Sequence, residues 1–579
     1  MKDVYKPFYK AVKDGNAIVN PQDSAEKAAF NISSYLKQNA LDFPYRKAVL
    51  CPTTRDSHGR MAYTHLTFSQ LEKESDRFAQ ALVNAGLARG DRTILMVKPG
   101  IDFFILTFAL FKAGAVPVVV DPGMGVKRML GCLQESQPDA FIGIPLAHLL
   151  RLAFPKYFSS VKTCVTVGKK WFWGGVSTHD FQDLPDKAFS VANTRREDTA
   201  AILFTTGSTG PAKGVVYTHG TFDAQIQTIR QHFNFSDEET DLPTFPLFAL
   251  FDPALGITAV IPDMDFTKPA KVNPDHILSA IQDHGVTSMF ASPALLNAVG
   301  AFGQEHKVKL PSLKRVVSAG APVFPANIKQ FSSMLTEEAL IHTPYGATEA
   351  VPIISMDSRE ILAETADLSE KGYGLCVGYP LQGMDVKIIR ITDSAIDKWS
   401  EDLQVEPGEV GEIIVKGDLV TAHYFKDAKA DKLAKIAGEN RPWHRMGDLA
   451  WQDSKGRLWF CGRKCHRVIT KFGPLYTIPC ESLFNNHPLV FRSALVGIGK
   501  RPNQIPAICI EPIKNSRLIP KDQLKDELIK IARANELTKN IHTVLFHNNF
   551  PVDIRHNAKI FREELAVWAE GKMNRKGKP

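Results

Sequence analysis

The 579-residue chain is 44% apolar and 23% charged, which is typical of a soluble globular enzyme with ample material for a core. At this length two or more domains are expected. The net charge of +8 is uneven: residues 464–579 hold 20 Lys and Arg against 10 Asp and Glu, so the rest carries −2. This basic segment could bind nucleic acid, anionic lipid or a nucleotide, or form a solvated surface. No zinc-finger, RRM or basic-zipper signature supports nucleic acid.

Neither a secretory signal nor a transmembrane segment is predicted. The first residues, MKDVYKPFYKAVKDG, lack an apolar stretch after their charges. The apolar segment 103–120 contains Lys112, Gly114 and Pro117, and therefore predicts a buried helix, a turn and a buried strand rather than a membrane span. Eight scattered cysteines without a signal peptide indicate reduced thiols and a cytoplasmic protein.

From about residue 30 to 400, apolar strands alternate with helical patterns. The expected helices are 103–114 and 275–285, and the expected strands are 93–97, 116–120, 200–204, 287–291 and 315–320. This alternation predicts an α/β fold with parallel sheets. Residues 385–391 and 409–416 instead alternate between polar and apolar residues, which favours a small antiparallel or barrel-like subdomain.

The charge shift near residue 463 predicts a domain boundary, followed by a small α+β domain. Its expected elements are a hairpin at 467–479, a helix starting at 481–487, strands at 493–499 and 506–513, a helix at 522–536 and a strand at 542–551. Zinc ligands are conceivable at Cys461, Cys465, His466, Cys480 and His487. However, no CxxC pair occurs and the spacings fit no common zinc site, so we interpret these as structural thiols and loop residues.

Residues 205–214, TTGSTGPAKG, suggest a phosphate-binding loop. A Walker A loop is excluded because Ala212 stands where its second Gly would be and Gly214 follows Lys213 in place of Ser or Thr. The dinucleotide pattern GxGxxG is absent too. Backbone N–H groups near the glycines, with the hydroxyls of the Thr and Ser residues, could wrap a polyphosphate. The alternative is a surface turn rich in small polar residues.

Five further motifs follow this loop: SAGAPV (318–323), YGATEA (345–350), GDLAW (447–451), GRKCHRV (462–468) and NAKIFRE (557–563). In this order, over about residues 30–570, the motifs resemble those of the acyl-adenylate-forming superfamily, which includes acyl-CoA synthetases. The resemblance implies that a carboxylate attacks the α-phosphate of ATP and pyrophosphate leaves. It also implies an N-terminal AMP- and acyl-binding domain at 1–463 and a mobile C-terminal domain at 464–579 that carries the catalytic lysine.

The resemblance also implies a role for each motif, with ATP and Mg²⁺ as cofactors. The catalytic group comprises Lys559, Thr348 and Glu349: Lys559 reaches the α-phosphate and the substrate carboxylate, Thr348 binds the α-phosphate, and Glu349 holds Mg²⁺. Asp448 accepts the ribose hydroxyls, and Arg463 contacts ribose or phosphate. The remaining nucleotide-binding residues are Thr205, Thr206, Gly207, Ser208, Thr209, Gly210, Lys213, Gly320, Ala321, Pro322, Tyr345 and Gly346.

Two departures from the superfamily pattern point to one branch. Cys465 stands where the superfamily has a hinge Asp, and Ala558 precedes Lys559 in place of Gly. Together with DPGMG (121–125) and FIGIPLAHL (141–149), they make the chain similar to olefin β-lactone synthetases. That branch activates a long-chain β-hydroxy acid, whose hydroxyl then closes a lactone and expels AMP without CoA.

Two alternatives remain open. The first is a fatty acyl-CoA synthetase, in which CoA is a second substrate, and the second is an inactive nucleotide-binding scaffold. The expected partners are small molecules, ATP and a fatty or β-hydroxy fatty acid, with other enzymes of a lipid or hydrocarbon pathway as further candidates. Residues 246–266, with Phe248 and Phe251, are interpreted as an acyl-binding wall or as core packing.

Overall fold

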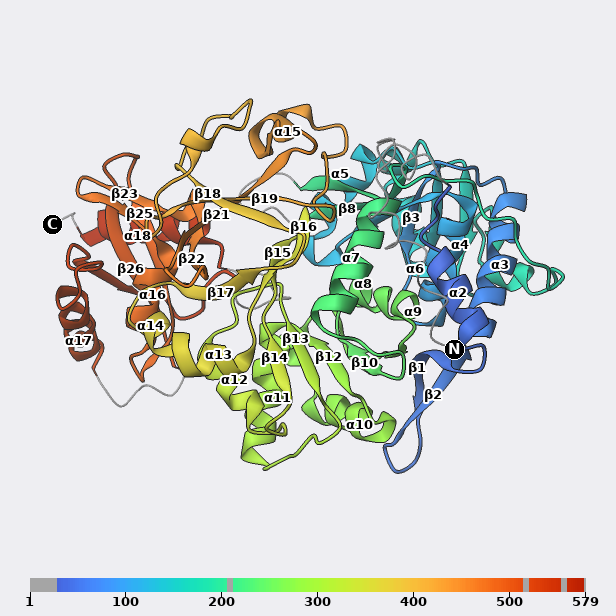
Figure 1. The fold of residues 1–579 in the computed structure, drawn as a ribbon, viewed down its shortest axis with the longest axis horizontal. Coiled ribbons are helices and arrows are strands. Elements are labelled where there is room, and N and C mark those ends of the chain that lie inside the picture. The colour runs from blue at the N-terminus through green and yellow to red at the C-terminus, as the bar shows by residue number, and fades with distance from the viewer. Residues whose placement is uncertain (1–28, 206–211, 514–519, 553–559, 577–579) are drawn as a thin grey trace, which may run out of the picture.

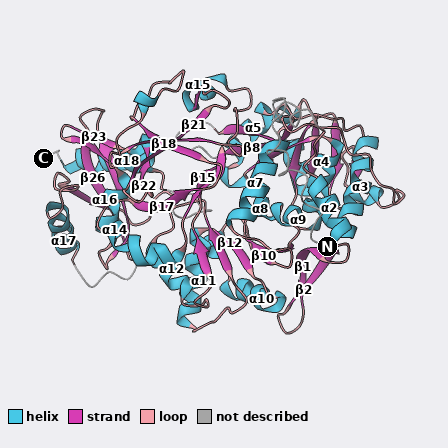
Figure 2. Cartoon of the chain, viewed as in Figure 1, coloured by secondary structure: helices cyan, strands magenta, loops and turns pink. Residues whose placement is uncertain are grey.

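The computed structural model describes residues 29–205, 212–513, 520–552 and 560–576. Within these residues, helices pack around three large sheets, and the chain passes from the first sheets at one end of the long axis to the C-terminal elements at the other (Figure 1; Figure 2). The described helices of regular α type are α2 (Ser34–Asp42), α3 (Phe68–Asn84), α4 (Ile101–Ala113), α5 (Val126–Glu135), α6 (Pro145–Ala153), α7 (His219–His232), α8 (Pro246–Ala249), α9 (Phe251–Leu255), α10 (Pro274–His284), α11 (Pro293–Glu305), α12 (Pro325–Ser332), α13 (Ser358–Glu360), α14 (Ala366–Glu370), α15 (Ala428–Ala434), α16 (Thr477–Asn485), α17 (Lys521–Arg533) and α18 (Arg562–Lys576).

Two of the sheets have seven described strands each and are mainly parallel. The first has the order β7 (Val176–Ser177), β6 (Thr163–Thr166), β5 (Ala140–Gly143), β3 (Arg92–Met96), β4 (Val116–Val120), β8 (Thr199–Thr205) and β9 (Lys213–Thr218). The second has the order β14 (Leu340–His342), β13 (Arg315–Ser318), β12 (Ser288–Ala291), β10 (Thr240–Pro243), β11 (Thr258–Val260), β1 (Lys47–Arg55) and β2 (Met61–Thr67). The predicted parallel α/β architecture is confirmed, with β9 and β2 as antiparallel edge strands.

Helix α4 is the predicted apolar helix, and it is buried on all sides. Every residue from Phe103 to Ala113 is buried, because α4 packs against α3 and contacts both β1 and β4, one strand from each parallel sheet. Gly114 ends the helix in a left-handed conformation at φ 69°, which glycine adopts without strain. Among the described residues, no helix is both long and apolar enough to cross a membrane.

The charge within α4 is compensated by carboxylates of α3. Lys112 Nζ is fully buried and lies 2.8 Å from Glu72 Oε2 and 2.7 Å from Asp76 Oδ1. A buried ammonium group is tolerated only when it is paired in this way. The lysine that argued against a membrane span therefore fixes α4 to α3.

The third sheet is antiparallel, as predicted from the alternating segments. Its described order is β15 (Tyr345–Ala347), β16 (Ala350–Ser355), β17 (Leu375–Pro380), β22 (Leu458–Arg463), β21 (Trp443–Gln452), β19 (Gly411–Lys416) and β18 (Asp385–Ile389), and β20 (Lys435–Ile436) also pairs with β21. The pairing of β21 with β22 places Asp448 directly opposite Arg463. Two residues of distant motifs thus become neighbours.

The C-terminal elements form a hairpin and a small sheet. The hairpin joins β23 (Val468–Thr470) to β24 (Gly473–Leu475), and the sheet has the order β25 (Val490–Ile498), β26 (Ile505–Pro512) and β27 (Thr543–Phe546). The predicted start of a helix at 481 is wrong, because α16 begins at Thr477 and includes the end of the predicted hairpin. Pro479 stands in the first turn of α16, where its missing N–H costs no helical hydrogen bond. The domain division at 463/464 stays a prediction.

Candidate active site

One large cavity, with a volume of about 1520 Å³, brings together residues from all three large sheets. Several predicted site residues line it: Thr205, Lys213, Gly320, Gly346, Thr348, Glu349 and Arg463. Thr206, Gly207, Ser208, Thr209, Gly210 and Lys559 lie outside the described residues. Tyr345, Asp448, Ala321 and Pro322 are not part of the lining, although each is next to a lining residue or, for Pro322, two residues from Gly320 in the chain.

Two strands of the first sheet flank the segment predicted as a phosphate-binding loop. Thr205 ends β8 and Lys213 begins β9, and the two residues are paired across the antiparallel ladder. Lys213 Nζ lies 4.8 Å from the centre of the Tyr424 ring, within the range of a cation–π interaction. The ends of the loop therefore open onto the cavity beside Tyr424.

Thr348 and Glu349 form the turn of the β15–β16 hairpin, so neither belongs to a helix start. The Tyr424 hydroxyl donates to Glu349 Oε1 at 2.7 Å, and the Thr421 backbone N–H donates to the Glu349 carbonyl oxygen at 2.9 Å. The Tyr217 hydroxyl donates to the Thr348 carbonyl oxygen. Burial, together with the Glu349 charge, raises the pKa of both tyrosines, so they stay protonated donors. The turn is thus held rigidly at the cavity wall.

A second group joins Tyr345, Asp448 and Arg463. The Tyr345 hydroxyl donates to Asp448 Oδ2 at 2.6 Å, and Arg463 Nε lies 3.1 Å from Asp448 Oδ1. Burial raises the pKa of Asp448, and the charge of Arg463 opposes that shift. Among the described residues no donor has hydrogen-bond geometry to Oδ1, which is buried and faces Arg463 as an ion pair.

Two basic side chains near Glu349 and Lys213, namely Lys435 and His444, were not identified in the sequence analysis. Burial lowers the pKa of Lys435 to about 8, against the opposing charges of Glu349 and Asp431. Burial and then the charges of Lys435 and Lys213 hold the pKa of His444 well below its usual value, so this imidazole is neutral. Within the described residues its Nδ1 has no hydrogen-bond partner, and the residue lines the cavity. Only the position of His444, four residues before Asp448, could have drawn attention to it.

A second part of the cavity lining is apolar, and we call it the aromatic end. Phe248 of α8 and Phe251 of α9 line it, as predicted for the segment 246–266, and the rings of Phe248 and Phe290 are 4.4 Å apart. Phe266, the last residue of the same segment, lines it as well. Further aromatic side chains come from segments that the sequence did not link to the site; they are Phe103, Phe108 and Phe111 of α4, Phe222 of α7, and Phe245. The cavity therefore joins a polar, charged end to an aromatic end.

Comparisons with known proteins agree with this arrangement. A family model described as "AMP-binding enzyme" matches residues 36–425. An olefin beta-lactone synthetase of Xanthomonas campestris is 45% identical over 93% of this chain and 97% of its own length. One of Stenotrophomonas maltophilia is 45% identical over 94% of this chain and 99% of its own length.

The fold has solved counterparts as well. The O-succinylbenzoate coenzyme A synthetase of Bacillus subtilis, solved in complex with ATP and magnesium ion, has a TM-score of 0.72. It is 20% identical and covers 92% of this chain and 98% of its own. At that identity the likeness concerns the fold.

Proposed function

The chain belongs to the AMP-binding enzyme family, and from this premise we propose that it activates a long-chain β-hydroxy fatty acid and closes it to a β-lactone. In the first step a carboxylate oxygen attacks the α-phosphorus of ATP and pyrophosphate leaves. In the second step the β-hydroxyl oxygen attacks the carbonyl carbon, loses its proton and displaces AMP. Two adenylating relatives named as olefin beta-lactone synthetases support this order of steps.

The observation that carries the proposal is the single cavity that joins a nucleotide-like end to an aromatic end. Pockets for small ligands usually have volumes of about 300–1,000 Å³, so about 1520 Å³ leaves room for a nucleotide and an alkyl chain together. The phenylalanine side chains would stabilise each buried methylene by about 0.8 kcal/mol. A fatty acyl chain fits this lining better than a polar acid does.

The polar end offers a chemically suitable donor set for ATP and Mg²⁺. Glu349 supplies a carboxylate whose Oε1 accepts one hydrogen bond from Tyr424, which leaves lone pairs for a hard cation that is otherwise held by phosphate oxygens and water. Mg²⁺ bound there would neutralise charge on the phosphates. The Asp448 carboxylate would accept from the ribose hydroxyls, Arg463 would contact ribose or phosphate, and Thr348 would face the α-phosphate.

Roles on the undescribed segments rest on the resemblance of their motifs. Lys559 would stabilise the charge that develops on the α-phosphate, and the loop from Thr206 to Gly210 would hold the β- and γ-phosphates with Lys213. Tyr345 would lie against the adenine, and Gly320, Ala321, Pro322 and Gly346 would shape that contact. These assignments remain proposals that mutation can test.

Lactone closure needs no second substrate. The hydroxyl and the activated carbonyl belong to one molecule, and an internal nucleophile gains an effective molarity of about 10⁵ M or more when it is well oriented. An aromatic channel that fixes the alkyl chain would hold the hydroxyl near the carbonyl carbon.

The eight cysteines are free thiols in the structure, which supports the cytoplasmic location we propose for this reaction.

Product analysis tests the proposal. Purified chain would be supplied with ATP, Mg²⁺ and a long-chain β-hydroxy acid, without CoA, and a matched acid that lacks the hydroxyl would be the control. We expect AMP, pyrophosphate and a β-lactone from the hydroxy acid, and only slow pyrophosphate release from the control. AMP and pyrophosphate without lactone would contradict the second step, and a thioester formed only after CoA is added would favour the CoA-ligase alternative.

The scaffold alternative predicts a different result. An inactive nucleotide-binding protein would release no pyrophosphate with either acid. Lys559→Ala serves as the control, because equal pyrophosphate release by the wild type and this variant would show that Lys559 lacks the role assigned to it.

A further inference from the structure

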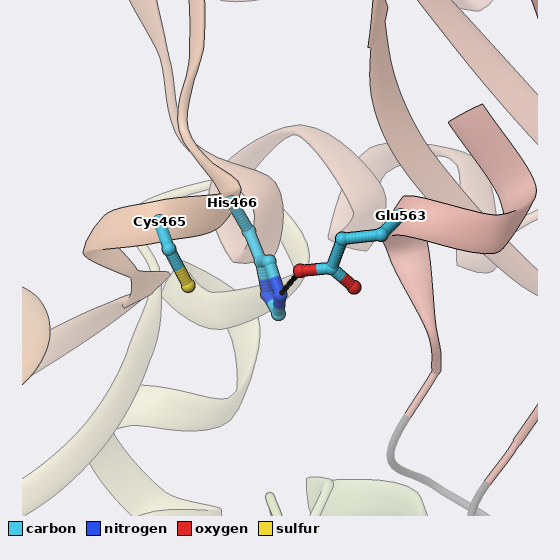
Figure 3. Close-up of side chains that lie close together, drawn as sticks. All are labelled: Cys465, His466 and Glu563. Carbon is cyan, nitrogen blue, oxygen red and sulfur yellow. Dashed lines mark hydrogen bonds and ion pairs between the residues drawn. The ribbon is translucent and has the colours of Figure 1, made fainter. Parts of the chain in front are cut away.

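Three potential metal ligands meet where the antiparallel sheet passes into the C-terminal elements (Figure 3). Cys465 and His466 belong to the short 3-10 helix η7 (Lys464–His466), which follows β22, and Glu563 lies in the first turn of α18. Figure 3 shows the Cys465 and Glu563 side chains approaching the His466 ring from its two sides. One ligand atom of each residue lies within 4.8 Å of the other two.

We propose that Cys465, His466 and Glu563 bind a zinc ion and leave its fourth position open. Thiolate, imidazole and carboxylate are the ligands that zinc takes in proteins, and three of them with one open position is a recurrent arrangement. The thiolate favours zinc over Mg²⁺ or Ca²⁺, which prefer oxygen ligands. This site is separate from Glu349 and does not depend on the proposed reaction.

The distances are close to those that zinc requires. With bonds of about 2.0–2.3 Å, the ligand atoms of a tetrahedral site lie roughly 3.3–3.6 Å apart. His466 Nε2 lies 3.1 Å from Glu563 Oε1, so this pair is already near that spacing. Since the sulfur lies within 4.8 Å of both, a change at the Cys465 side chain of about an ångström would complete the set.

The backbone is held in place on both sides of the cluster. Arg562, next to Glu563, makes a paired contact with the buried Glu481, at 2.8 Å to Oε1 and 2.7 Å to Oε2. Arg501 donates to the carbonyl oxygen of Cys465 at 2.6 Å and to that of Arg467 at 2.9 Å. Such ordering reduces the entropy lost when an ion binds, because the ligands are oriented beforehand.

The ligands of the cluster differ in how exposed they are. The His466 side chain is only 6% exposed, whereas Cys465 is exposed and lines the large cavity. An ion could therefore reach the sulfur from the cavity.

A bound ion would have one structural consequence. It would tie the start of α18 to η7, the segment that directly follows Arg463. From the sequence alone, Cys465 and His466 are conceivable zinc ligands but are interpreted as structural, because no zinc-ligand spacing is present. Glu563 was not considered, since it is far from them along the chain. Only the fold brings the carboxylate to the other two.

The molecule offers its own matched control. His487 Nε2 and Glu527 Oε2 also lie 3.1 Å apart, in a His–Glu pair of the same geometry. In the described part of the chain, however, only the Cys465 cluster gathers three His, Cys, Asp or Glu ligands. Glu527→Gln should therefore leave zinc binding unchanged, whereas Glu563→Gln should weaken it.

The test uses the full chain, freed of metal by chelation, and zinc chloride alone. Competition with a coloured chelator should give one zinc ion per chain, with at least tenfold weaker binding in Cys465→Ser and in Glu563→Gln and no change in Glu527→Gln. Cobalt in place of zinc should give a thiolate-to-metal absorption band that Cys465→Ser removes. Binding well below one ion per chain, or equal binding by all these variants, would overturn the proposal.

A measurement on the wild type guards against variants that fail to fold. Zinc should slow alkylation of Cys465 by iodoacetamide, measured by peptide mass spectrometry, and should leave the half-buried Cys164 unaffected as an internal reference. Equal alkylation of Cys465 with and without zinc would also overturn the proposal.

Discussion

The two ends of the cavity are built on different principles. At the polar end the two carboxylates proposed for the site have directed partners: Tyr424 for Glu349, and Tyr345 and Arg463 for Asp448. At the aromatic end the rings of α4, α7, α8 and α9 touch without directed bonds. Hydrogen bonds to charged groups depend on geometry, whereas apolar contact depends mainly on buried area. The polar end should therefore be intolerant of small changes, and the aromatic end should respond in proportion to the volume removed.

The largest effect is expected at Glu349. Glu349→Gln keeps the size of the side chain and removes the charge that we propose holds Mg²⁺, so kcat for pyrophosphate release should fall by about 100- to 1,000-fold. Tyr424→Phe, which removes only the hydrogen bond to Oε1, should cost about tenfold. Steady-state kinetics of pyrophosphate release measure both. Equal rates in Glu349→Gln and wild type would contradict the role in Mg²⁺ binding that we propose for Glu349.

Asp448 should come next. Asp448→Asn leaves Arg463 without its partner and removes the acceptor proposed for the ribose, so KM for ATP should rise by about 10- to 100-fold. Asp453→Asn is the matched control, since Asp453 pairs with Arg457 in the turn that joins β21 to β22 and does not line the cavity. A similar rise in both variants would mean that the effect is structural and not a loss of nucleotide contact.

The aromatic end should give a smaller, graded response. Phe248→Ala should raise KM for a long-chain acid by roughly tenfold, because a buried ring contributes about 1.5–3 kcal/mol and part of the contact area remains. Phe248→Leu should lose less, as conservative apolar changes usually do. A short-chain acid that does not reach this ring should be unaffected by either change. Identical losses for short and long acids would contradict an acyl wall at Phe248.

The smallest effect concerns stability and Lys435. Its pKa is about 8 in the folded protein and about 10.5 when unfolded, so the unfolded chain binds more protons between these values. The free energy of unfolding of the wild type should therefore rise as pH increases from 8 to 10.5, relative to that of the variant Lys435→Met, whose methionine carries no charge. Urea unfolding of both proteins at pH 8 and pH 10 measures the difference. The same pH dependence in both would contradict a lowered pKa of Lys435 in the folded protein.

The sequence predicted the polar end better than the aromatic end, for a physical reason. The phosphate and ribose contacts that we propose come from short contiguous motifs, so Thr348, Glu349 and Asp448 could be recognised by their neighbours. The parallel sheets and the burial of α4 followed from apolar periodicity and from Gly114. These features depend on neighbouring residues in the chain, so they can be predicted without knowing the three-dimensional structure.

Other residues could not be found in this way. Tyr217, Tyr424 and Lys435 reach the site from three separate strands or loops, and no pattern around them marks a function. The phenylalanines of α4 were predicted as core, because a buried helix and a cavity wall have the same apolar sequence. The predicted helix start at 481 failed since Pro479 suggested a turn, although proline also fits the first turn of a helix.

Transfer of oxygen from the acid to AMP tests the central claim most directly. A β-hydroxy acid labelled with ¹⁸O in both carboxylate oxygens would be incubated with the enzyme, ATP and Mg²⁺ in the absence of CoA. If the carboxylate attacks the α-phosphate and the hydroxyl then displaces AMP, mass spectrometry should find one ¹⁸O in AMP and one in the lactone. Unlabelled AMP beside a labelled lactone would contradict an acyl-adenylate intermediate and with it the roles proposed for the polar end of the cavity.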